Sequence, residues 1–323
     1  MVVPGAEAPA SGPSVADLLR EGIDRLRAAG TERPRLDSEL LLGQAAGLER
    51  TAIVAHPERT VDRAAAAAYE AAIARRERGE PVAYIRGVKE FFGLELHVDA
   101  RALIPRPETE LLVELAARQA LGRLAARDGS AAAEPLRIVD VGTGSGAIPV
   151  ALSTALGAGG LLGAVRIMAT DISDGALALA GSNLAAHGLA DVVALSAADL
   201  LPADPGMFDL VLANLPYVAS GDVPHLPVDT SFEPALALDG GPDGLHVIRR
   251  LLALLPARLA PAGVALLEIG GDQGAAIVAA VVAVLPGWAC RVEPDLAGLP
   301  RVALVARDQA GIAAGPGRIA GQS

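Results

Sequence analysis

"LRIVDVGTGSGAIPVAL", residues 136–152, carries the clearest fold signal in this sequence. A short aliphatic run ends in three glycines spaced two residues apart, Gly142, Gly144 and Gly146, and a helical pattern follows them. A buried strand that turns through glycines into a helix is typical of the first β–α unit of a parallel sheet, where the turn lets a ligand approach the backbone closely. A tight turn without a ligand is the alternative interpretation.

Strand and helix patterns alternate along the chain after this stretch. Apolar runs such as "AVRIMATD" and "FDLVLANLP" indicate strands, and "SDGALALAGSNLAAHG" and "GLHVIRRLLALLPARL" indicate helices between them. The last two runs, "ACRVEPD" and "PRVALVAR", are close enough in sequence to form an antiparallel hairpin. This order predicts a parallel α/β sheet that is closed by an antiparallel hairpin.

The segment before this sheet is helical in pattern and carries no cluster of catalytic residue types. Its first helix begins at Ser14, which can cap it, and the three long helical stretches end at glycines. They predict a small bundle with a structural or docking role. The predicted division is a disordered terminus over 1–13, a helical docking domain over 14–80, a β-hairpin linker over 81–107, an α/β domain over 108–307 and a flexible tail over 308–323.

The composition of the 323 residues limits the possible partners. Asp and Glu total 38 against 27 Lys and Arg, so the net charge of −11 gives no general attraction to a phosphate backbone and argues against direct nucleic-acid binding. The single cysteine, Cys290, cannot form an internal disulfide and is expected to be a small buried hydrophobe. Without a signal-peptide pattern or an apolar stretch of membrane-spanning length, the chain is predicted to be cytoplasmic. It is also expected to be a monomer without a metal site.

Acidic residues beside the glycine turn indicate what it binds. Asp140 precedes the turn by two residues, and Asp171 ends the second strand, where a carboxylate can accept hydrogen bonds from both hydroxyls of a ribose. Asp171 could also cap the next helix, although Ser173 is the more natural cap. The glycine spacing is one residue shorter than in the nicotinamide fingerprint. This combination resembles the S-adenosylmethionine loop of class I methyltransferases.

The fourth strand ends in Asn214-Leu215-Pro216-Tyr217 at the same sheet edge. A planar nitrogen that accepts a methyl group needs two hydrogen-bond acceptors to hold its N–H groups. The Asn214 side-chain oxygen and the Leu215 carbonyl can be these acceptors, and the Tyr217 ring can cover the substrate. The tetrapeptide resembles the (Asp/Asn/Ser)-Pro-Pro-(Tyr/Phe/Trp) motif of amino-nitrogen methyltransferases, except that Leu215 replaces the first proline. A simple strand-ending turn is the alternative.

The segments that flank this motif resemble one family. "EPVAYIRGVKEFFGLELHV", "LIPRPETELLVE", "FEPALALDGGPDGLHVIRRLL" and "GVALLEIGGDQG" are similar to the release-factor glutamine methyltransferases, the HemK/PrmC family, over about residues 15–306. The resemblance implies a class I methyltransferase fold: a Rossmann-like seven-stranded sheet with an N-terminal helical bundle and a short β-hairpin linker. It also implies a substrate, the glutamine of the Gly-Gly-Gln motif in class I peptide-chain release factors.

The resemblance further implies roles for matched positions. The residues expected to contact S-adenosylmethionine are Asp140, Gly142, Thr143, Gly144, Ser145, Gly146, Asp171, Leu200 and Asn214. The residues expected to hold the glutamine are Asn214, Leu215, Pro216 and Tyr217, with Phe92 and Pro105 at the entrance.

Some of these positions have a second interpretation. Leu200 is aliphatic where the family often has an aromatic residue, so it keeps an apolar wall but loses stacking. Phe91 and Phe92 could equally be packed in the core. Arg106 and Glu108 could form a structural ion pair, and Glu268 could be structural or near the site.

Other functions compatible with the sequence are an adenine-N6 methyltransferase acting on RNA or DNA, a glutamine methyltransferase with another protein target, and a non-catalytic binding module. The first would require a flipped base and a positive surface, which the net acidity disfavours. The presence of Asp140, Asp171 and Asn214 together argues against the non-catalytic module.

Overall fold

The computed structural model describes residues 12–126, 134–203 and 206–312. Most of the predicted disordered terminus, residues 1–11, therefore lies outside the described residues. Contacts divide the chain into two compact units, of which the first runs to Gly87 and includes Pro227–Phe232. The second unit begins at Val88, so the predicted linker is divided between the two units and its hairpin belongs to the second.

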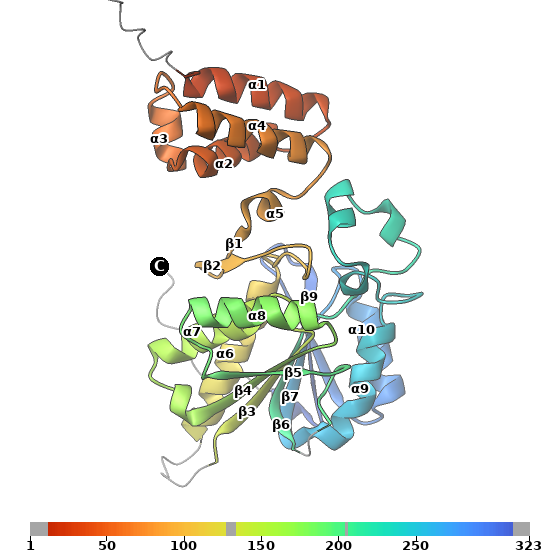
Figure 1. Cartoon of the computed structure of the whole chain (residues 1–323). Helices are drawn as coiled ribbons and strands as arrows, with labels where there is room; N and C mark the ends of the chain where they lie inside the picture. The colour runs from red at the N-terminus through yellow and green to blue at the C-terminus, as the bar shows by residue number, and fades with distance from the viewer. Residues whose placement is uncertain (1–11, 127–133, 204–205, 313–323) are drawn as a thin grey trace, which may run out of the picture. The chain divides into compact units, whose positions relative to one another are not determined.

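The first unit is a helical bundle (Figure 1). The Ser14 hydroxyl accepts a hydrogen bond from the Asp17 N–H at 3.1 Å and so caps the first helix as predicted. Tyr69 is buried in the centre of the bundle, and its hydroxyl lies 2.6 Å from the Ser38 hydroxyl. The helices are α1 (Val15–Ala28), α2 (Pro34–Ala46), α3 (Arg50–Ala55), α4 (Arg63–Glu77) and α5 (Val82–Arg86), of which the short α3 and α5 were not predicted.

The second unit contains a seven-stranded sheet with the order β5-β4-β3-β6-β7-β9-β8 (Figure 1). The first five of these strands pair in parallel, and β9 is antiparallel to both β7 and β8, which confirms the predicted parallel sheet with its closing hairpin. The strands are β3 (Leu136–Val141), β4 (Val165–Asp171), β5 (Val193–Ala197), β6 (Phe208–Ala213), β7 (Leu259–Glu268), β8 (Ala289–Pro294) and β9 (Pro300–Ala306).

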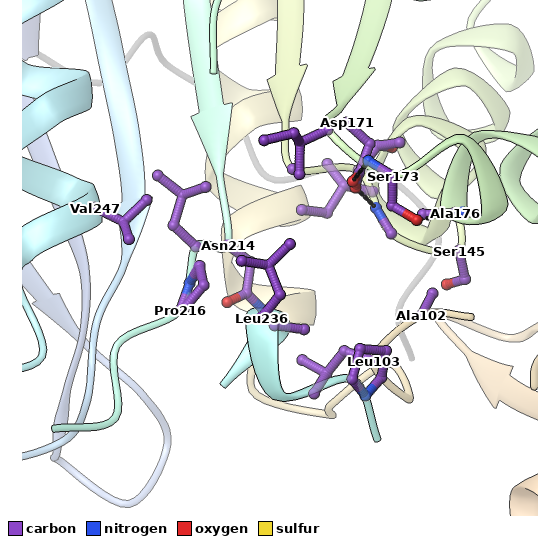
Figure 2. A pocket seen from close by; sticks show the side chains of 18 of the residues that line it. Ala102, Leu103, Ser145, Asp171, Ser173, Ala176, Asn214, Pro216, Leu236 and Val247 are labelled. Atoms are coloured by element: carbon purple, nitrogen blue, oxygen red, sulfur yellow. Dashed lines mark hydrogen bonds between the residues drawn. The ribbon is translucent and has the colours of Figure 1, made fainter. Parts of the chain in front are cut away.

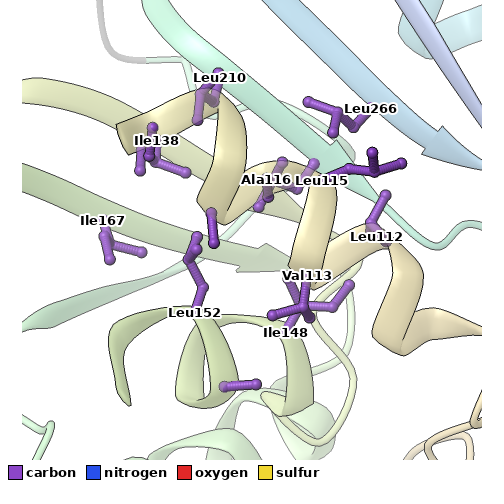
Figure 3. Close-up of a cluster of buried hydrophobic side chains, with 14 of the residues drawn as sticks. Leu112, Val113, Leu115, Ala116, Ile138, Ile148, Leu152, Ile167, Leu210 and Leu266 are labelled. Atoms are coloured by element: carbon purple, nitrogen blue, oxygen red, sulfur yellow. The ribbon is translucent and has the colours of Figure 1, made fainter. Parts of the chain in front are cut away.

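Helices cover both faces of this sheet because successive strand residues point to opposite sides. Ile138 of β3 packs with the residues of one core cluster, whereas the next residue, Val139, belongs to a second cluster on the other face. Figure 3 shows the first cluster, in which Ile138, Leu210 and Leu266 from three strands meet side chains of α6 and α7. The helices are α6 (Thr109–Ala126), α7 (Ala147–Ala158), α8 (Asp174–Ala186), α9 (His246–Arg258) and α10 (Gly274–Val284).

A hairpin of β1 (Val88–Phe91) and β2 (Leu94–His97) precedes α6. Phe92 and Gly93 form its turn with φ angles of 55° and 72°. Such two-residue turns favour Asn-Gly, because positive φ strains most other side chains. The Phe92 N–H donates a hydrogen bond to the Glu110 carboxylate at 2.9 Å, and its ring packs against the first core cluster. Core contacts therefore hold Phe92 in this unusual conformation.

The predicted flexible tail starts with ordered structure. Residues 309–312 form a short helix, α11 (Gln309–Ile312), whose Ile312 is buried, while residues 313–323 lie outside the described residues. Across the described residues, no helix combines the length and the apolar character needed to cross a membrane.

Candidate active site

A cavity of about 270 Å³ opens at the carboxyl ends of β3, β4 and β6. This is the edge at which parallel α/β sheets bind ligands. Figure 2 shows Asp171 and Ser173 on one side of the cavity and Asn214 and Pro216 on the other. The fold thus brings together two groups of residues that the sequence linked only by their positions at strand ends.

The glycine turn from β3 to α7 forms one wall of the cavity. Gly142 has a φ of 72°, a conformation that other residues rarely adopt. A Cβ atom at Gly142 would also lie only 3.0 Å from the Leu215 side chain. The N–H groups of Gly142 and Thr143 both donate to the Thr170 carbonyl at 2.8 Å, which fixes the turn to β4.

Asp171 ties this turn to the next one. Its carboxylate accepts hydrogen bonds from the N–H groups of Gly144 and Ser173, each at 2.9 Å. The Ser173 hydroxyl accepts from the Ala176 N–H at 3.2 Å and caps α8, so the cap is the serine, as expected. Each carboxylate oxygen has a second lone pair, which leaves Asp171 able to accept further hydrogen bonds from a ligand in the cavity.

Asp140 is a buried acid at the end of β3. It is 1% exposed, and neither carboxyl oxygen has a close hydrogen-bond partner among the described residues. Burial raises the pKa of Asp140 to about 7; the nearby Thr143 hydroxyl opposes this shift, and the negative charge of Asp171 adds to it. Asp140 is not among the cavity-lining residues. Burying a carboxyl group without a hydrogen-bond partner costs free energy, and a bound cationic group nearby would offset this cost.

Asn214 presents an unsatisfied acceptor at the cavity. Its side-chain Nδ2 donates to the Thr109 hydroxyl at 3.0 Å, whereas its Oδ1 is buried without a partner among the described residues. Leu215 and Pro216 also line the cavity. This arrangement is what a site for an N–H-bearing substrate needs: a fixed acceptor that none of the described residues occupies.

Tyr217 lies behind this segment and is not among the cavity-lining residues. Its hydroxyl is 3.5 Å from the Glu268 carboxylate, and burial raises the pKa of Tyr217 to about 12, so the ring stays neutral. Its carbonyl accepts a hydrogen bond from the Gln273 side chain at 2.8 Å. A Cβ atom at Gly244 would lie 2.2 Å from the same carbonyl, so only glycine allows this close approach.

The opposite wall differs from what the sequence suggested. Pro105 lines the cavity, but Phe92 is not among the lining residues, and Phe91 is buried in the core. Arg106 pairs with Glu233 at 2.5 Å, rather than with Glu108. Glu233 also accepts a hydrogen bond from the Ile104 N–H at 3.0 Å.

Sequence reasoning missed Thr109 and Glu233, which contact the site from distant parts of the chain. It also missed Leu236 and Val247, two apolar residues of the wall. The only sequence signals were a threonine beside the "PRPE" turn and an acid before Pro234.

Leu200 does line the cavity, with a φ of 70°, and its carbonyl accepts a hydrogen bond from the Thr170 hydroxyl at 2.7 Å.

The strand order, the glycine turn and the acids at the strand ends define the fold of a class I methyltransferase. A solved structure of the hMettl16 catalytic domain in complex with MAT2A 3'UTR hairpin 1 has this fold, with a TM-score of 0.51, 17% identity and coverage of 78% of this chain and 84% of that chain. Models for the PrmC N-terminal domain and for ribosomal protein L11 methyltransferase (PrmA) match residues 17–87 and 121–217, respectively.

Relatives of the whole chain narrow this class to one family. The release factor glutamine methyltransferase of Moorella thermoacetica is 42% identical over 90% of this chain and 97% of its own length. Those of Bradyrhizobium diazoefficiens and Rhodospirillum rubrum are 38% and 41% identical over 93% and 95% of this chain, covering 97% and 89% of their own lengths. The chain therefore belongs to the release factor glutamine methyltransferase family, as the flanking motifs indicated, and is an enzyme.

Proposed function

We propose that this enzyme transfers a methyl group from S-adenosylmethionine to the side-chain amide nitrogen (N5) of the glutamine in the Gly-Gly-Gln motif of class I peptide-chain release factors. The observation that carries the proposal is the buried, unpaired Oδ1 of Asn214 at the cavity, in a chain of this family.

An amide nitrogen is a weak nucleophile because its lone pair is delocalised into the carbonyl group. Asn214 Oδ1 and the Leu215 carbonyl would each accept one of its N–H hydrogens and so orient the nitrogen for in-line attack. A nitrogen–carbon bond forms, the bond from that carbon to sulfur breaks, and one amide proton is released. The residues act by placing the substrate, since no strong base is needed beforehand.

The residues of the glycine turn suit S-adenosylmethionine, which supplies an electrophilic methyl group on a positively charged sulfur. Gly142, Gly144 and Ser145 line the cavity, where a Cβ atom at Gly142 would be strained. Asp171 keeps lone pairs for ribose hydroxyls. The Asp140 carboxyl, which has no partner among the described residues and does not itself line the cavity, would favour a cationic ligand by its charge. These groups would hold the methyl donor beside Asn214.

Nucleic acid is a poorer fit as the substrate. The three arginines that line the cavity are each paired with an acid: Arg101 with Asp99, Arg106 with Glu233 and Arg250 with Asp199. The charges at the cavity mouth therefore do not form the positive surface that would attract a phosphate backbone.

The test is mass spectrometry of a purified full-length class I release factor after incubation with this enzyme and S-adenosylmethionine. We expect a single methyl group on the glutamine of the Gly-Gly-Gln motif. Asn214→Ala should lower kcat by about a hundredfold or more, because a preorganised acceptor is worth roughly 3 kcal/mol in a transition state. Its affinity for S-adenosylmethionine should fall much less than kcat, although Asn214 is also expected to contact the cofactor. Methylation of an added adenine-containing RNA, but not of the release factor, would refute the proposal.

A further inference from the structure

Asn214 and Thr109 are polar residues that line the cavity, and Glu268 is a buried acid that is not among the lining residues. Thr109 is 4% exposed and Glu268 is fully buried. Asn214 directly follows β6 and Glu268 ends β7, and these strands are neighbours in which Ala213 pairs with Leu267. Thr109 is the first residue of α6 and donates from its backbone N–H to the Arg106 carbonyl at 3.1 Å.

The proposed function depends on which end of the Asn214 amide faces the substrate. The oxygen and nitrogen of an amide occupy nearly the same space, so packing alone does not choose between them. With Oδ1 toward the cavity, the side chain accepts from a substrate N–H. With Nδ2 toward the cavity, the Asn214 side chain would point its own N–H hydrogens at the substrate N–H and repel it.

The Thr109 hydroxyl can decide this choice, because it has a single hydrogen. If that hydrogen is given to another acceptor, the Thr109 oxygen is left to accept from Asn214 Nδ2. The contact between Nδ2 and Oγ1 is 3.0 Å long, and Oδ1 is the atom left without a partner among the described residues. The hydrogen of Thr109 must then point elsewhere.

Glu268 is the acceptor that the fold offers for this hydrogen. Its Oε1 lies 3.5 Å from the Tyr217 hydroxyl, and its Oε2 is buried without a close partner among the described residues. Burial raises the pKa of Glu268 to about 7, and the nearby Thr109 hydroxyl acts in the opposite direction by favouring the ionised form. In its ionised form, which prevails above about pH 7, the Glu268 carboxylate only accepts hydrogen bonds and so imposes a direction on the contacts.

We propose that Thr109 and Glu268 are positioning residues that set the orientation of the Asn214 amide: Glu268 takes the Thr109 hydrogen, Thr109 takes a hydrogen of Asn214 Nδ2, and Oδ1 is thereby turned to the substrate. This inference rests on the proposed function for its consequence in catalysis. The orientation itself is a property of the enzyme without substrate and can be measured separately.

The sequence makes that measurement simple, because Asn183 and Asn214 are the only asparagines. Labelling with 15N-asparagine gives two side-chain amide signals, and Asn214→Ala identifies them. The Asn183 amide donates to the carbonyls of His97 and Ser145 at 2.9 and 2.8 Å, so its signal is an internal control. Thr109→Val should speed hydrogen exchange of the Asn214 amide about tenfold and leave that of Asn183 unchanged.

The kinetic arm uses the same variants with a purified full-length class I release factor. Thr109→Val should lower kcat about tenfold with little change in KM, and Thr109→Ser, which keeps the hydroxyl, should restore both kcat and exchange protection. Thr154→Val is the matched control, since it removes a hydroxyl that donates to the Val150 carbonyl at 2.8 Å outside the cavity. Thr154→Val should change neither kcat nor the hydrogen exchange of the Asn214 amide. Thr109→Ala repeats the test if the valine variant does not fold.

A double-mutant cycle tests the part of Glu268. Glu268→Leu removes the acceptor, and if the two residues act as one chain, Thr109→Val combined with Glu268→Leu should be no slower than the slower single variant. Multiplied losses in kcat would overturn the role of Glu268. Parent-like exchange and kcat in Thr109→Val would overturn the whole inference. An inactive parent enzyme would refute the proposed function, while the exchange measurement would still decide the orientation.

Discussion

Leu215, which stands where the related motif has proline, has a packing role. Its side chain is 5% exposed and belongs to the second core cluster. Because Gly142 has no Cβ, the Leu215 side chain can pack directly beneath the glycine turn. The Leu215 side chain thus links the proposed substrate-holding segment to the proposed cofactor-binding turn. A proline ring at this position would not make the same contact.

Replacing Leu215 by proline should affect stability more than catalysis. The carbonyl that would hold the substrate amide is kept, so kcat should stay within about tenfold, equivalent to some 1.4 kcal/mol. Lost packing should lower the free energy of unfolding by about 1–3 kcal/mol, as measured by urea denaturation. Leu215→Ala is the control, because it loses the packing but keeps the N–H. A kcat that collapses in the proline variant alone would show that the Leu215 N–H matters.

The buried acid Asp140 should make cofactor binding depend on pH. Its pKa is raised by burial from 3.8 to about 7, and a cationic ligand favours the ionised form. Affinity for S-adenosylmethionine should therefore rise as the pH rises through about 7, by at most about tenfold per unit. The ligand-free protein should show the opposite trend, since a raised carboxyl pKa stabilises the fold at low pH and this stabilisation is lost as the pH rises through about 7.

Calorimetric titration at pH 6 and pH 8 measures this dependence. Asp140→Asn should flatten it, whereas Asp191→Asn, a change at an exposed acid away from the cavity, should not. A parent enzyme with the same dissociation constant at both pH values would contradict the assignment.

At the scale of elements, one wall of the cavity depends on a link between two segments far apart in the sequence. Glu233 holds the Leu103–Arg106 stretch by accepting from the Ile104 N–H and from Arg106. Pro234 and Leu236 follow it directly and line the cavity. Since the Glu233 side chain is only 2% exposed, this ion pair is little screened by water. The pair should fix the shape of the wall.

Glu233→Gln should loosen this wall. We expect the free energy of unfolding to fall by about 1–3 kcal/mol, the cost of weakening hydrogen bonds to a buried charge, and KM for the release factor to rise more than kcat falls. Asp243→Asn is the control, because it breaks an exposed pair with Arg249 that should contribute little. Equal effects of the two substitutions on stability and KM would show that the Glu233 pair has no special role.

At the scale of the whole molecule, the helical unit and the α/β unit have separate hydrophobic cores. All residues that line the cavity belong to the α/β unit. The match of residues 17–87 to a domain model of their own agrees with a distinct module. We therefore propose that the helical unit, which contributes no residue to the cavity lining, serves to dock the protein substrate.

Deleting residues 1–87 should therefore weaken methylation of a whole release factor far more than it weakens cofactor binding. The physical reason is that the cofactor residues keep all of their hydrogen-bond partners within the remaining unit. Calorimetry with S-adenosylmethionine and steady-state kinetics with the release factor give the two measurements. Equal loss of both would show instead that the helical unit supports the fold of the α/β unit.

Features that depend on local pattern could be predicted from the amino-acid sequence alone. The apolar run at 136–141, its glycine turn and the helix after it are encoded in one continuous stretch, as are Asp171 and Asn214 at the ends of their strands. Parallel strands place their carboxyl ends at one edge of a sheet, so the strand pattern alone predicts that these residues lie near one another. The hairpin conformation at Phe92 is not predictable in this way, because a positive φ there is imposed by core contacts.

The groups that complete the site are known only from long-range contacts in the folded protein. Thr109 reaches Asn214 across 105 residues of sequence, and Arg106 pairs with Glu233 across 127 rather than with the nearby Glu108. No periodicity or local motif encodes such pairs, because they exist only once the sheet order brings α6 beside β6 and β7. The orientation of the Asn214 amide is likewise a property of the folded protein. The sequence gives the residue type, but the direction of the amide is set by neighbours that are distant in the sequence.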